Sequence, residues 1–560
     1  MEFLRSSLSA TALMCCCVLC RAHAGELRPV LSPIGPAEVV WNKSRDACPD
    51  TKWVHRLHRN VPCEEPDSMP LAWHNPLTNR SYLISATDCT FAAIGPTLAG
   101  VSGPHDCGHA PYVAVNDSRP WSYANHQWLQ STRVFPNGSG FALIHNEFHG
   151  EQEDNESYCS FDSKTATGQC IEWSTDLGAT TDGGATWHQT HAPLITLPRK
   201  YVKDASIAGY GELGAILRNS HDNYYYAHVA RSYHNNTGAG PPNTVGNGSC
   251  VVRTANPSDP FSFRGWDGTG WNTEWANPYD VPPPTPADLR LRTCAAVDQG
   301  GDRSMHINPK QFAGPLTKIP DWPSHVLLAW PSGKRTPRVT YAFPAASGAA
   351  DGAAPFTAWE APTYLDLSGW FDPCTGLEEL DFMYPNLIDH DSPFSLSSGT
   401  TREEAEDDLV KSDGLSYTLA GNHSLYIYAV LQREYIVRIP VAWFQEGQTL
   451  PPAAYPPPPQ TPPRLNPTGC TKFKVLVGGK SGAAGVYTRQ GKGTDGTYLY
   501  VKDASHQLYH FQGAWVLGHK GVKRYYTAPS DDPERGVGVP YLWAARACPG
   551  VEVPTVACLS

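Results

Sequence analysis

The chain has 560 residues, of which 41% are hydrophobic and 17% charged, and its formal net charge is −11 at pH 7. This length suits roughly two to four domains, or one large repeat domain with an addition. An acidic chain lacks the basic surface on which nucleic-acid binding depends, so we expect no nucleic-acid partner. The 49 glycines, 51 prolines and many aromatic residues favour a turn-rich, all-β, extracellular protein.

Residues 1–24 have the pattern of a secretory signal peptide. Arg5 supplies the positive charge, Leu8–Cys20 forms an apolar run, and Ala22-His23-Ala24 fits a small-x-small cleavage site. The apolar run is too short to cross a bilayer, and no later segment is long and apolar enough to do so. The sequence therefore predicts a secreted protein without a membrane span, and we expect a monomer.

Cysteine usage favours an oxidising compartment. Of the 16 cysteines, four lie in the signal segment, which leaves twelve, an even number that suits disulfides. The local pairs Cys89–Cys107, Cys159–Cys170 and Cys250–Cys294 are plausible, and no CxxC…CxxC zinc spacing occurs. Eight N-x-S/T sequons fit a glycosylated surface; they begin at Asn42, Asn79, Asn116, Asn137, Asn155, Asn235, Asn247 and Asn422.

Short β-rich runs, separated by Gly, Pro, Asn and Asp, dominate the chain up to about residue 446. They group into five units near 67–110, 134–192, 205–266, 303–362 and 378–445. Units of four strands arranged radially are the blades of a β-propeller. The sequence thus predicts a five-bladed propeller over residues 25–446, in which 37–55 supplies the strand that closes the ring. A pair of β-sandwiches is the alternative, but it would not need five similar units.

The stretch TTDGGATW, Thr180–Trp187, matches the Asp-box pattern S/T-x-D-x-G-x-x-W. We expect a hairpin turn in which Asp182 caps backbone amides, a glycine takes a positive φ and Trp187 packs into the blade. Asp-boxes recur in sialidase-like and other secreted glycan-processing propellers. The motif supports the fold more than it supports any function.

A proline-rich stretch, LPPAAYPPPPQTPPRLNPT, predicts a semi-rigid linker over residues 447–468. Short strands with glycine turns follow, so 469–560 are expected to form a small β module that contains disulfides. Nine of the twelve cysteines precede the linker and three follow it. Because both numbers are odd, full oxidation within the chain requires at least one disulfide that crosses the linker.

The stretch FALIHNEFHG, Phe141–Gly150, carries the most informative polar pattern. In a strand, side chains two residues apart share a face, so His145, Glu147 and His149 should point the same way. The first strand of each propeller blade lines the ring axis, so these three should face a common pocket. Further polar candidates near the starts of the other units are Asp67, Glu212, His221, His306, Asp381 and Tyr384.

The order of units and the last of them, MYPNLIDHDSPF…SLYIYAVLQREYIVRIPVAW, resemble five-bladed propeller glycoside hydrolases of the arabinanase and invertase type, over residues 37–446. The chain also resembles secreted proteins with an HNE(F/Y)HG-like strand followed by an STDGG turn. The hydrolases use an Asp on blade one, a second acid on blade two and a Glu proton donor on blade three. The resemblance implies Asp67, Glu147 and Glu212 as the catalytic acids. The arginine triad and Tyr–Glu pair of a true sialidase are not identified.

Three functions remain open at this stage. In glycoside hydrolysis one acid gives a proton to the leaving oxygen and another activates water or attacks. The substrate would be a glycan or polysaccharide held by His145, His149, His221, His306, Asp381 and Tyr384, and no cofactor would be required.

The first alternative is a non-enzymatic protein that binds glycans or a surface and lacks a competent acid pair. The second is a metal-dependent enzyme with His145, Glu147 and His149 as ligands, completed by His306, His221 or Asp381. A structural calcium at the axis also fits, because many oxygen ligands converge there.

Overall fold

The computed structural model describes residues 29–49, 51–54, 59–62, 64–85, 89–115, 117–150, 153, 158–159, 170–201, 203, 207–219, 222–232, 248–282, 291–297, 316–318, 325–329, 337–345, 355–372, 377, 380–390, 425–445, 449–454, 472–475, 485–492, 498–502, 506–511, 514–519, 523–529, 541–542 and 555–559. The expected signal peptide, most of the expected linker, His221 and His306 lie outside these residues.

The chain divides into two compact units, one of Met1–Ser368 with Leu380–Pro452 and one of Gly369–Glu379 with Ala453–Ser560. Strands make up nearly all the regular structure that is described, so the all-β prediction is confirmed. The described helical segments are single turns, namely α2 (Lys43–Asp46), η2 (Leu98–Gly100), η4 (Pro260–Ser262) and η7 (Ser368–Trp370). Within the described ranges, no helix is long and apolar enough to cross a membrane.

The largest sheet of the first unit has nine strands. Its order is β10 (His126–Val134), β11 (Gly140–His149), β12 (Ile171–Thr180), β14 (Ile207–Leu213), β16 (Tyr225–Ser232), β17 (Gly248–Thr254) and β18 (Arg264–Gly265), while β13 (His188–Ile195) pairs with β12 and β15 (Leu217–Arg218) with β16. Neighbours are antiparallel except β12 and β14, which are parallel over three residue pairs. That junction brings two antiparallel groups of strands together.

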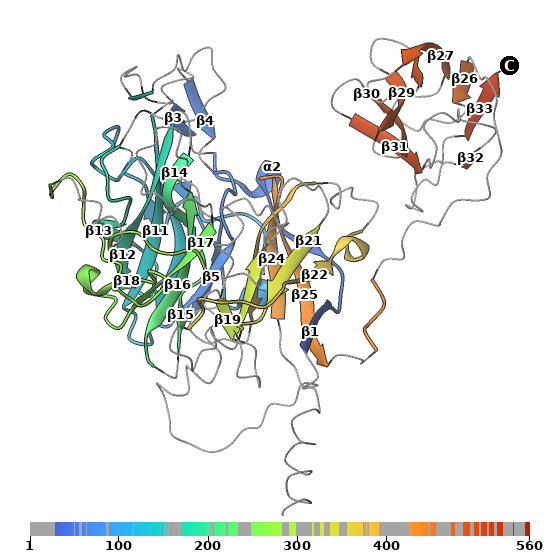
Figure 1. Ribbon diagram of the computed structural model, residues 1–560. Coiled ribbons are helices and arrows are strands. Elements are labelled where there is room, and N and C mark those ends of the chain that lie inside the picture. The colour runs from blue at the N-terminus through green and yellow to red at the C-terminus, as the bar shows by residue number, and fades with distance from the viewer. Residues whose placement is uncertain are drawn as a thin grey trace, which may run out of the picture. The chain divides into compact units, whose positions relative to one another are not determined.

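A five-stranded sheet joins the two ends of the first unit. Its order is β1 (Pro29–Pro33), β25 (Tyr435–Gln445), β24 (Leu425–Leu431) and β23 (Phe382–Asp389), and β2 (Glu38–Asn42) also pairs with β25. Figure 1 shows β1, in blue, beside β25, in orange. The early segment that the sequence assigned to ring closure therefore does pair with the last strand of the unit.

Smaller sheets complete the two units. In the first unit, one sheet has the order β19 (Leu316–Lys318), β20 (His325–Ala329), β21 (Arg338–Ala342) and β22 (Thr363–Asp366). A second has the order β5 (Leu71–Asn75), β6 (Arg80–Ile84) and β8 (Ala93–Gly95). Two further sheets pair β3 (Thr51–Val54) with β4 (Arg59–Pro62) and β7 (Cys89–Thr90) with β9 (Tyr112–Val113). The second unit has one sheet in the order β31 (Lys523–Pro529), β30 (Ala514–His519), β29 (His506–Phe511), β28 (Tyr498–Val501), β27 (Gly485–Lys492), β26 (Lys472–Val475), β33 (Thr555–Leu559) and β32 (Tyr541–Leu542). Among the described strands, no sheet closes on itself.

The turn at 180–187 has the geometry expected of it. Asp182 Oδ1 accepts from the Thr186 amide at 2.9 Å and from Thr180 Oγ1 at 2.7 Å. Gly183 and Gly184 have φ of 74° and 83°. A Cβ on Gly184 would lie 2.4 Å from Trp73 Nε1, so the turn packs closely on β5. Trp187 is buried edge-on against Trp73, which ties the end of β12 to the smaller sheet.

The disulfides correct one expectation. Cys159–Cys170 and Cys250–Cys294 are confirmed, but Cys107 pairs with Cys48 rather than with Cys89. Cys89 is itself in a disulfide. The local-pair argument was wrong here because residues 48 and 107, although 59 positions apart, are brought to a Cα separation of 5.4 Å by the fold, within the range that a disulfide spans.

Asp176 on β12 is a buried acid with no counter-charge beside it among the described residues. It is fully buried; its Oδ2 accepts from the side-chain amides of Gln127 at 3.2 Å and Gln189 at 3.0 Å. Its Oδ1 has no hydrogen-bond partner within the described residues. Burial raises the pKa of Asp176 well above its ordinary value, although the two amides act against it. A buried carboxyl of this kind binds its proton more tightly in the folded chain than in the unfolded chain.

We therefore expect Asp176→Asn to stabilise the protein at neutral pH. A pKa raised on folding gives stability that is full below the unfolded pKa of about 3.9 and declines as pH rises. Asparagine removes that decline, so the free energy of unfolding should increase by on the order of 1–2 kcal/mol at pH 7. The increase should vanish near pH 3. Thermal unfolding from pH 3 to 8 measures it.

Asp182→Asn is the matched control with the opposite sign. Burial alone would raise the pKa of Asp182, but hydrogen bonds from Thr186 and Thr180 outweigh it and lower that pKa. The free energy of unfolding of this variant should be about 1 kcal/mol lower than that of the unaltered protein at neutral pH and equal to it at low pH. A neutral-pH loss of stability in Asp176→Asn would contradict the assignment of a buried, unpaired acid.

Candidate functional site

The candidate site is built on one face of β11. The strand pairs with β12 in a continuous register and with β10 in a register broken once, between Leu129 and Ser131, so that Glu147 lies opposite His126 and Trp173. Because side chains alternate along a strand, His145, Glu147 and His149 share this face. The predicted face is therefore present, and its neighbours are aromatic rings that shield it from water.

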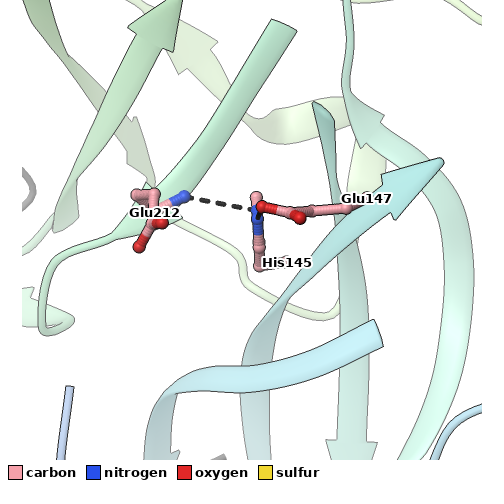
Figure 2. Close-up of side chains that lie close together, drawn as sticks. All are labelled: His145, Glu147 and Glu212. Carbon is pink, nitrogen blue, oxygen red and sulfur yellow. Dashed lines mark hydrogen bonds and ion pairs between the residues drawn. The ribbon is translucent and has the colours of Figure 1, made fainter. Parts of the chain in front are cut away.

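His145 is the centre of the arrangement, and its side chain is fully buried. Its ring stacks on Trp128 with centroids 5.0 Å apart. The backbone N–H of Glu212 donates to Nδ1 at 3.2 Å, and Nε2 lies 2.9 Å from Glu147 Oε1. An Nδ1 that accepts a hydrogen bond places the proton on Nε2. His145 is thereby set as a neutral donor to Glu147, and Figure 2 shows it between the two glutamates.

Glu147 is held as an ionised carboxylate. Its second oxygen, Oε2, lies 2.7 Å from His149 Nε2, so each oxygen contacts one imidazole. The residue is 6% exposed. Burial alone would raise the pKa of Glu147, but the hydrogen bonds from His145 and His149 outweigh it and hold that pKa well below its ordinary value. Glu147 can thus supply a fixed negative charge, and it does not store a proton near neutral pH.

Glu212 reaches the site because β14 passes unusually close to His145. A Cβ on Gly211 would lie 2.0 Å from the ring carbon Cε1 of His145, and one on Gly209 would lie 2.0 Å from the carbonyl oxygen of Trp173. Only glycine permits these approaches. Glu212 itself has φ of 50°, in the left-handed region. A ring nitrogen of His145 and one carboxylate oxygen each of Glu147 and Glu212 all lie within 4.8 Å of one another.

A metal ion does not fit this group as it stands. A ligand needs a lone pair, and the Nε2 of His145 that faces Glu147 carries a proton when Nδ1 accepts from the backbone. A ligating histidine usually shows the reverse pattern and donates from its second nitrogen. The donor set therefore suits a hydrogen-bonded carboxylate pair better than a metal centre.

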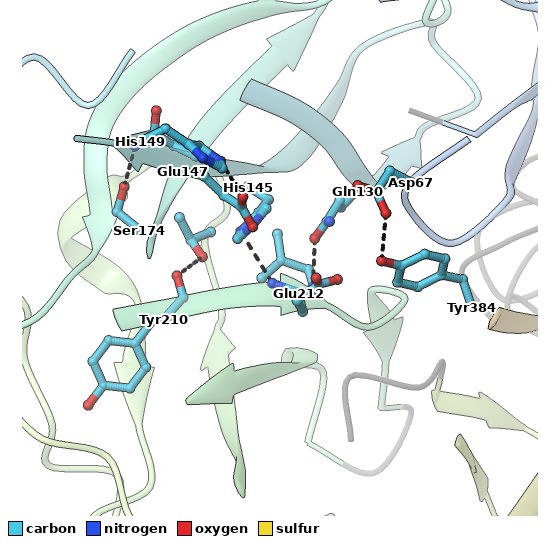
Figure 3. Close-up of polar contacts among 12 residues, drawn as sticks. Asp67, Gln130, His145, Glu147, His149, Ser174, Tyr210, Glu212 and Tyr384 are labelled. Carbon is cyan, nitrogen blue, oxygen red and sulfur yellow. Dashed lines mark hydrogen bonds and ion pairs between the residues drawn. The ribbon is translucent and has the colours of Figure 1, made fainter. Parts of the chain in front are cut away.

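Asp67 lies just before β5 and forms the other side of the site. Its Oδ1 accepts from the Tyr384 hydroxyl at 2.9 Å and lies 2.8 Å from Arg433 Nη2. Burial, and then the charges of Asp67 and Glu212, raise the pKa of the Tyr384 hydroxyl well above its ordinary value. Tyr384 therefore stays protonated and donates. Figure 3 shows Asp67, Glu147 and Glu212 in one group with His145, His149 and Tyr384.

Arg433 is the cation of this group. Burial alone would lower its pKa, but the negative charges around it, Asp67 first and Glu147 among them, outweigh burial and raise that pKa. The guanidinium therefore remains charged at any relevant pH, and it favours the ionised form of Asp67. The charge of Glu147 also contributes to the raised pKa of Arg433, although less than the charges of Asp67 and Glu65.

Six of the nine sequence-predicted residues meet here, namely Asp67, His145, Glu147, His149, Glu212 and Tyr384. Asp381 is exposed at the entry to β23, where its carbonyl oxygen accepts from the Gln432 amide. His221 and His306 lie outside the described residues. Figure 3 shows the three acids in one group, and the backbone of Asp381 is hydrogen-bonded to the turn that carries Arg433.

Two residues that the sequence did not single out also belong to the site. Gln130 occupies a β-bulge in β10, between Leu129 and Ser131, and its Oε1 accepts from the Leu213 amide at 2.8 Å. Arg433 lies at a hairpin tip, LQRE, without the Asn or Gly that such turns prefer. Because that turn signal is missing, the sequence does not identify Arg433, and nothing in it marks Gln130.

No protein-family model matches the sequence, and comparison with curated proteins gives no match. Among solved structures, the chain is similar to a candidate glycosidase from Bacteroides thetaiotaomicron, with 9% identity, a TM-score of 0.36 and coverage of 72% of this chain and 94% of that one. It is also similar to a candidate glycoside hydrolase from Bacteroides ovatus, with 10% identity, a TM-score of 0.37 and coverage of 73% and 96%. A glycosyl hydrolase from Bacteroides ovatus matches at 12% identity and a TM-score of 0.26 over 76% and 92%. Likeness at these scores carries no argument about function.

The close approach of β14 to His145 predicts a strong effect of Gly211→Ala. The added methyl would overlap the imidazole, so β14 or the ring must move. We expect a loss of about 1–3 kcal/mol in the free energy of unfolding. Gly100→Ala is the control, because its Cβ would meet only Thr97 Oγ1 at 3.5 Å, and a change within about 0.5 kcal/mol is expected. Equal stability of the two variants, measured by denaturant unfolding, would contradict the close approach.

Proposed function

We propose that the protein is a secreted, carbohydrate-active enzyme that hydrolyses a glycosidic bond with carboxylates at the axis of a five-bladed β-propeller. The observation that carries the proposal is the ionised Glu147, fixed by two histidines beside a second buried carboxyl, Glu212. Hydrolysis of a glycosidic bond needs carboxyl groups in different protonation states at close range. Asp67, with its own donors, supplies the third acid.

The strand groups support the propeller part of the proposal. Five successive groups are antiparallel, namely β5–β6–β8, β10–β11–β12–β13, β14–β16–β17–β18, β19–β20–β21–β22 and β23–β24–β25. They follow the five units expected from the sequence, and β2 adds to the last group. Asp67 precedes the first group, Glu147 lies on β11, the second strand of the second group, and Glu212 lies on β14, the first strand of the third group.

The residues can then be given roles. Glu212 is proposed as the proton donor, because the fixed charge of Glu147 disfavours a second ionised carboxylate beside it. Glu147 stabilises the positive charge that develops on the sugar when the bond to the leaving oxygen breaks. Asp67, kept ionised by Arg433, acts as base toward water or as nucleophile. His145 and His149 orient Glu147, and His149, whose side chain is 13% exposed at the end of β11, contacts sugar hydroxyls.

Two other functions use the same residues. A metal-dependent reaction is favoured by the short spacing of His145, Glu147 and Glu212, but it requires His145 to give up its backbone hydrogen bond. Under this alternative, zinc should raise the melting temperature and chelator should abolish activity. Non-enzymatic glycan binding is the other candidate; it predicts retention of glycans on an array without release of product.

The decisive variants are Glu212→Gln, Glu147→Gln and Asp67→Asn, assayed on a panel of plant and algal glycans for release of reducing ends. Loss of the proton donor or of the base should each lower turnover by on the order of 10²–10⁴-fold. The control is Glu274→Gln, because Glu274 is exposed and pairs only with Arg264 among the described residues.

All four variants should unfold as one cooperative transition, like the unaltered protein. Failure of the unaltered protein to cleave any glycan on the panel, or full activity of Glu212→Gln, would contradict the proposed hydrolysis. Binding of a glycan without its cleavage would favour the non-enzymatic alternative.

A further inference from the structure

Backbone strain gathers around Asp67. Among the described residues, eight that are not glycine have a positive φ, namely Asn79, Tyr123, Glu212, Asn223, Phe356, Tyr384, Gln432 and Arg433. Left-handed backbone is costly for a residue with a Cβ and persists only where the surrounding structure enforces it. Two of the eight, Tyr384 and Arg433, contact Asp67 directly, and a third, Glu212, lies close enough to Tyr384 for its charge to raise the pKa of that hydroxyl.

The turn that presents Arg433 is strained at both of its central residues. It joins β24 to β25, and the Glu434 amide closes it on the Leu431 carbonyl at 2.9 Å. Gln432 and Arg433 have φ of 49° and 57°. Positive φ at both positions is the signature of a type I′ hairpin turn, in which Asn and Gly are strongly preferred. Neither is present, so the choice of Arg at the second position is not explained by the turn itself.

Tyr384 is strained in a similar way. The residue before a proline is ordinarily extended, yet Tyr384, which precedes Pro385, has φ of 56°. It lies at a break in the pairing of β23 with β24, between Met383 and Asn386. This break turns the ring so that its hydroxyl donates to the same Asp67 oxygen that Arg433 contacts.

The ion pair alone does not account for this strain. The Arg433 side chain is 42% exposed and that of Asp67 is 21% exposed. An exposed pair adds little net stability because both charges remain hydrated. The conformational free energy of two left-handed residues in the turn exceeds the stability that such an ion pair contributes. The arrangement therefore lowers the stability of the fold, and it fixes one carboxylate oxygen in place.

We infer that Arg433 is a positioning residue for the proposed reaction: together with Tyr384 it holds Asp67 as an ionised carboxylate beside Glu147 and Glu212. This inference rests on the proposed function. The planar guanidinium and the tyrosine hydroxyl both act on Oδ1, so the rotation of the carboxylate is restricted and its other oxygen is directed away from them. Arg433 acts through Asp67 and does not itself exchange a proton, because it stays charged.

The test compares two substitutions in the same turn. Arg433→Asn removes the guanidinium but supplies a residue that favours left-handed backbone. Gln432→Asn relieves the neighbouring strain and leaves Arg433 unchanged. Both should fold, and Gln432→Asn should have a melting temperature equal to or above that of the unaltered protein, with unchanged turnover. Arg433→Asn should lower kcat/KM by at least about tenfold on the acid side of its pH profile, chiefly through kcat.

The pH profile separates positioning from a structural role. Asp67 must be ionised to act, and loss of Arg433 disfavours that form, so the acid limb of the kcat/KM profile should move to higher pH. Tyr384→Phe should move it in the same direction by a smaller amount, and Arg433→Lys, which keeps the positive charge, should show only part of the shift seen in Arg433→Asn.

Two different failures can be told apart. If the unaltered protein cleaves glycans and Arg433→Asn leaves the acid limb in place, the inference is overturned while the proposed function stands. A fall in the melting temperature of Arg433→Asn with a normal profile would likewise assign Arg433 a structural role only. If the unaltered protein cleaves no glycan, the proposed function fails, and the inference fails with it.

Discussion

The site depends on one hydrogen bond, from the backbone N–H of Glu212 to Nδ1 of His145. It requires the backbone of β14 to lie against the imidazole, which Gly211 alone permits. The bond places the ring proton on Nε2 and directs it at Glu147. A single main-chain contact thus selects the tautomer, the tautomer keeps Glu147 ionised, and the charge of Glu147 acts on the neighbouring Glu212.

A common hydrophobic core lies behind the elements that carry these groups. It joins residues of β5, β6, β10, β11, β23 and β24, including Trp73, Trp128, Ile144, Tyr384 and Val430. Trp187 of the 180–187 turn belongs to the same cluster. Because interiors are close-packed, a shift in one of these elements is passed to the others. This core gives Asp67 and Glu147 a fixed relation although they lie on different sheets.

Much of the site could be predicted from local rules. The i, i+2 spacing of His145, Glu147 and His149 identifies a shared strand face, and the turn residues Asp182 and Gly184 identify a hairpin. The strands themselves follow from β-branched and aromatic runs between glycines and prolines. What local rules cannot supply is long-range pairing, which is why the Cys48–Cys107 disulfide was missed.

The same limit applies to Arg433 and Gln130. Each enters the site through an irregularity, one a turn with two left-handed residues and the other a β-bulge. Such irregularities depend on tertiary packing that outweighs local preference. They are also the places where functional residues gather, so departures from local rules are themselves informative when a structure is available to reveal them.

The most direct measurement of the central claim is a crystal structure of the Glu212→Gln variant with a bound oligosaccharide substrate. We expect a glycosidic oxygen within about 3 Å of the residue-212 side chain, with Asp67 beside the adjoining sugar carbon and both imidazoles still bonded to Glu147. A sugar bound away from these residues, or an ion held between His145 and Glu147, would contradict it.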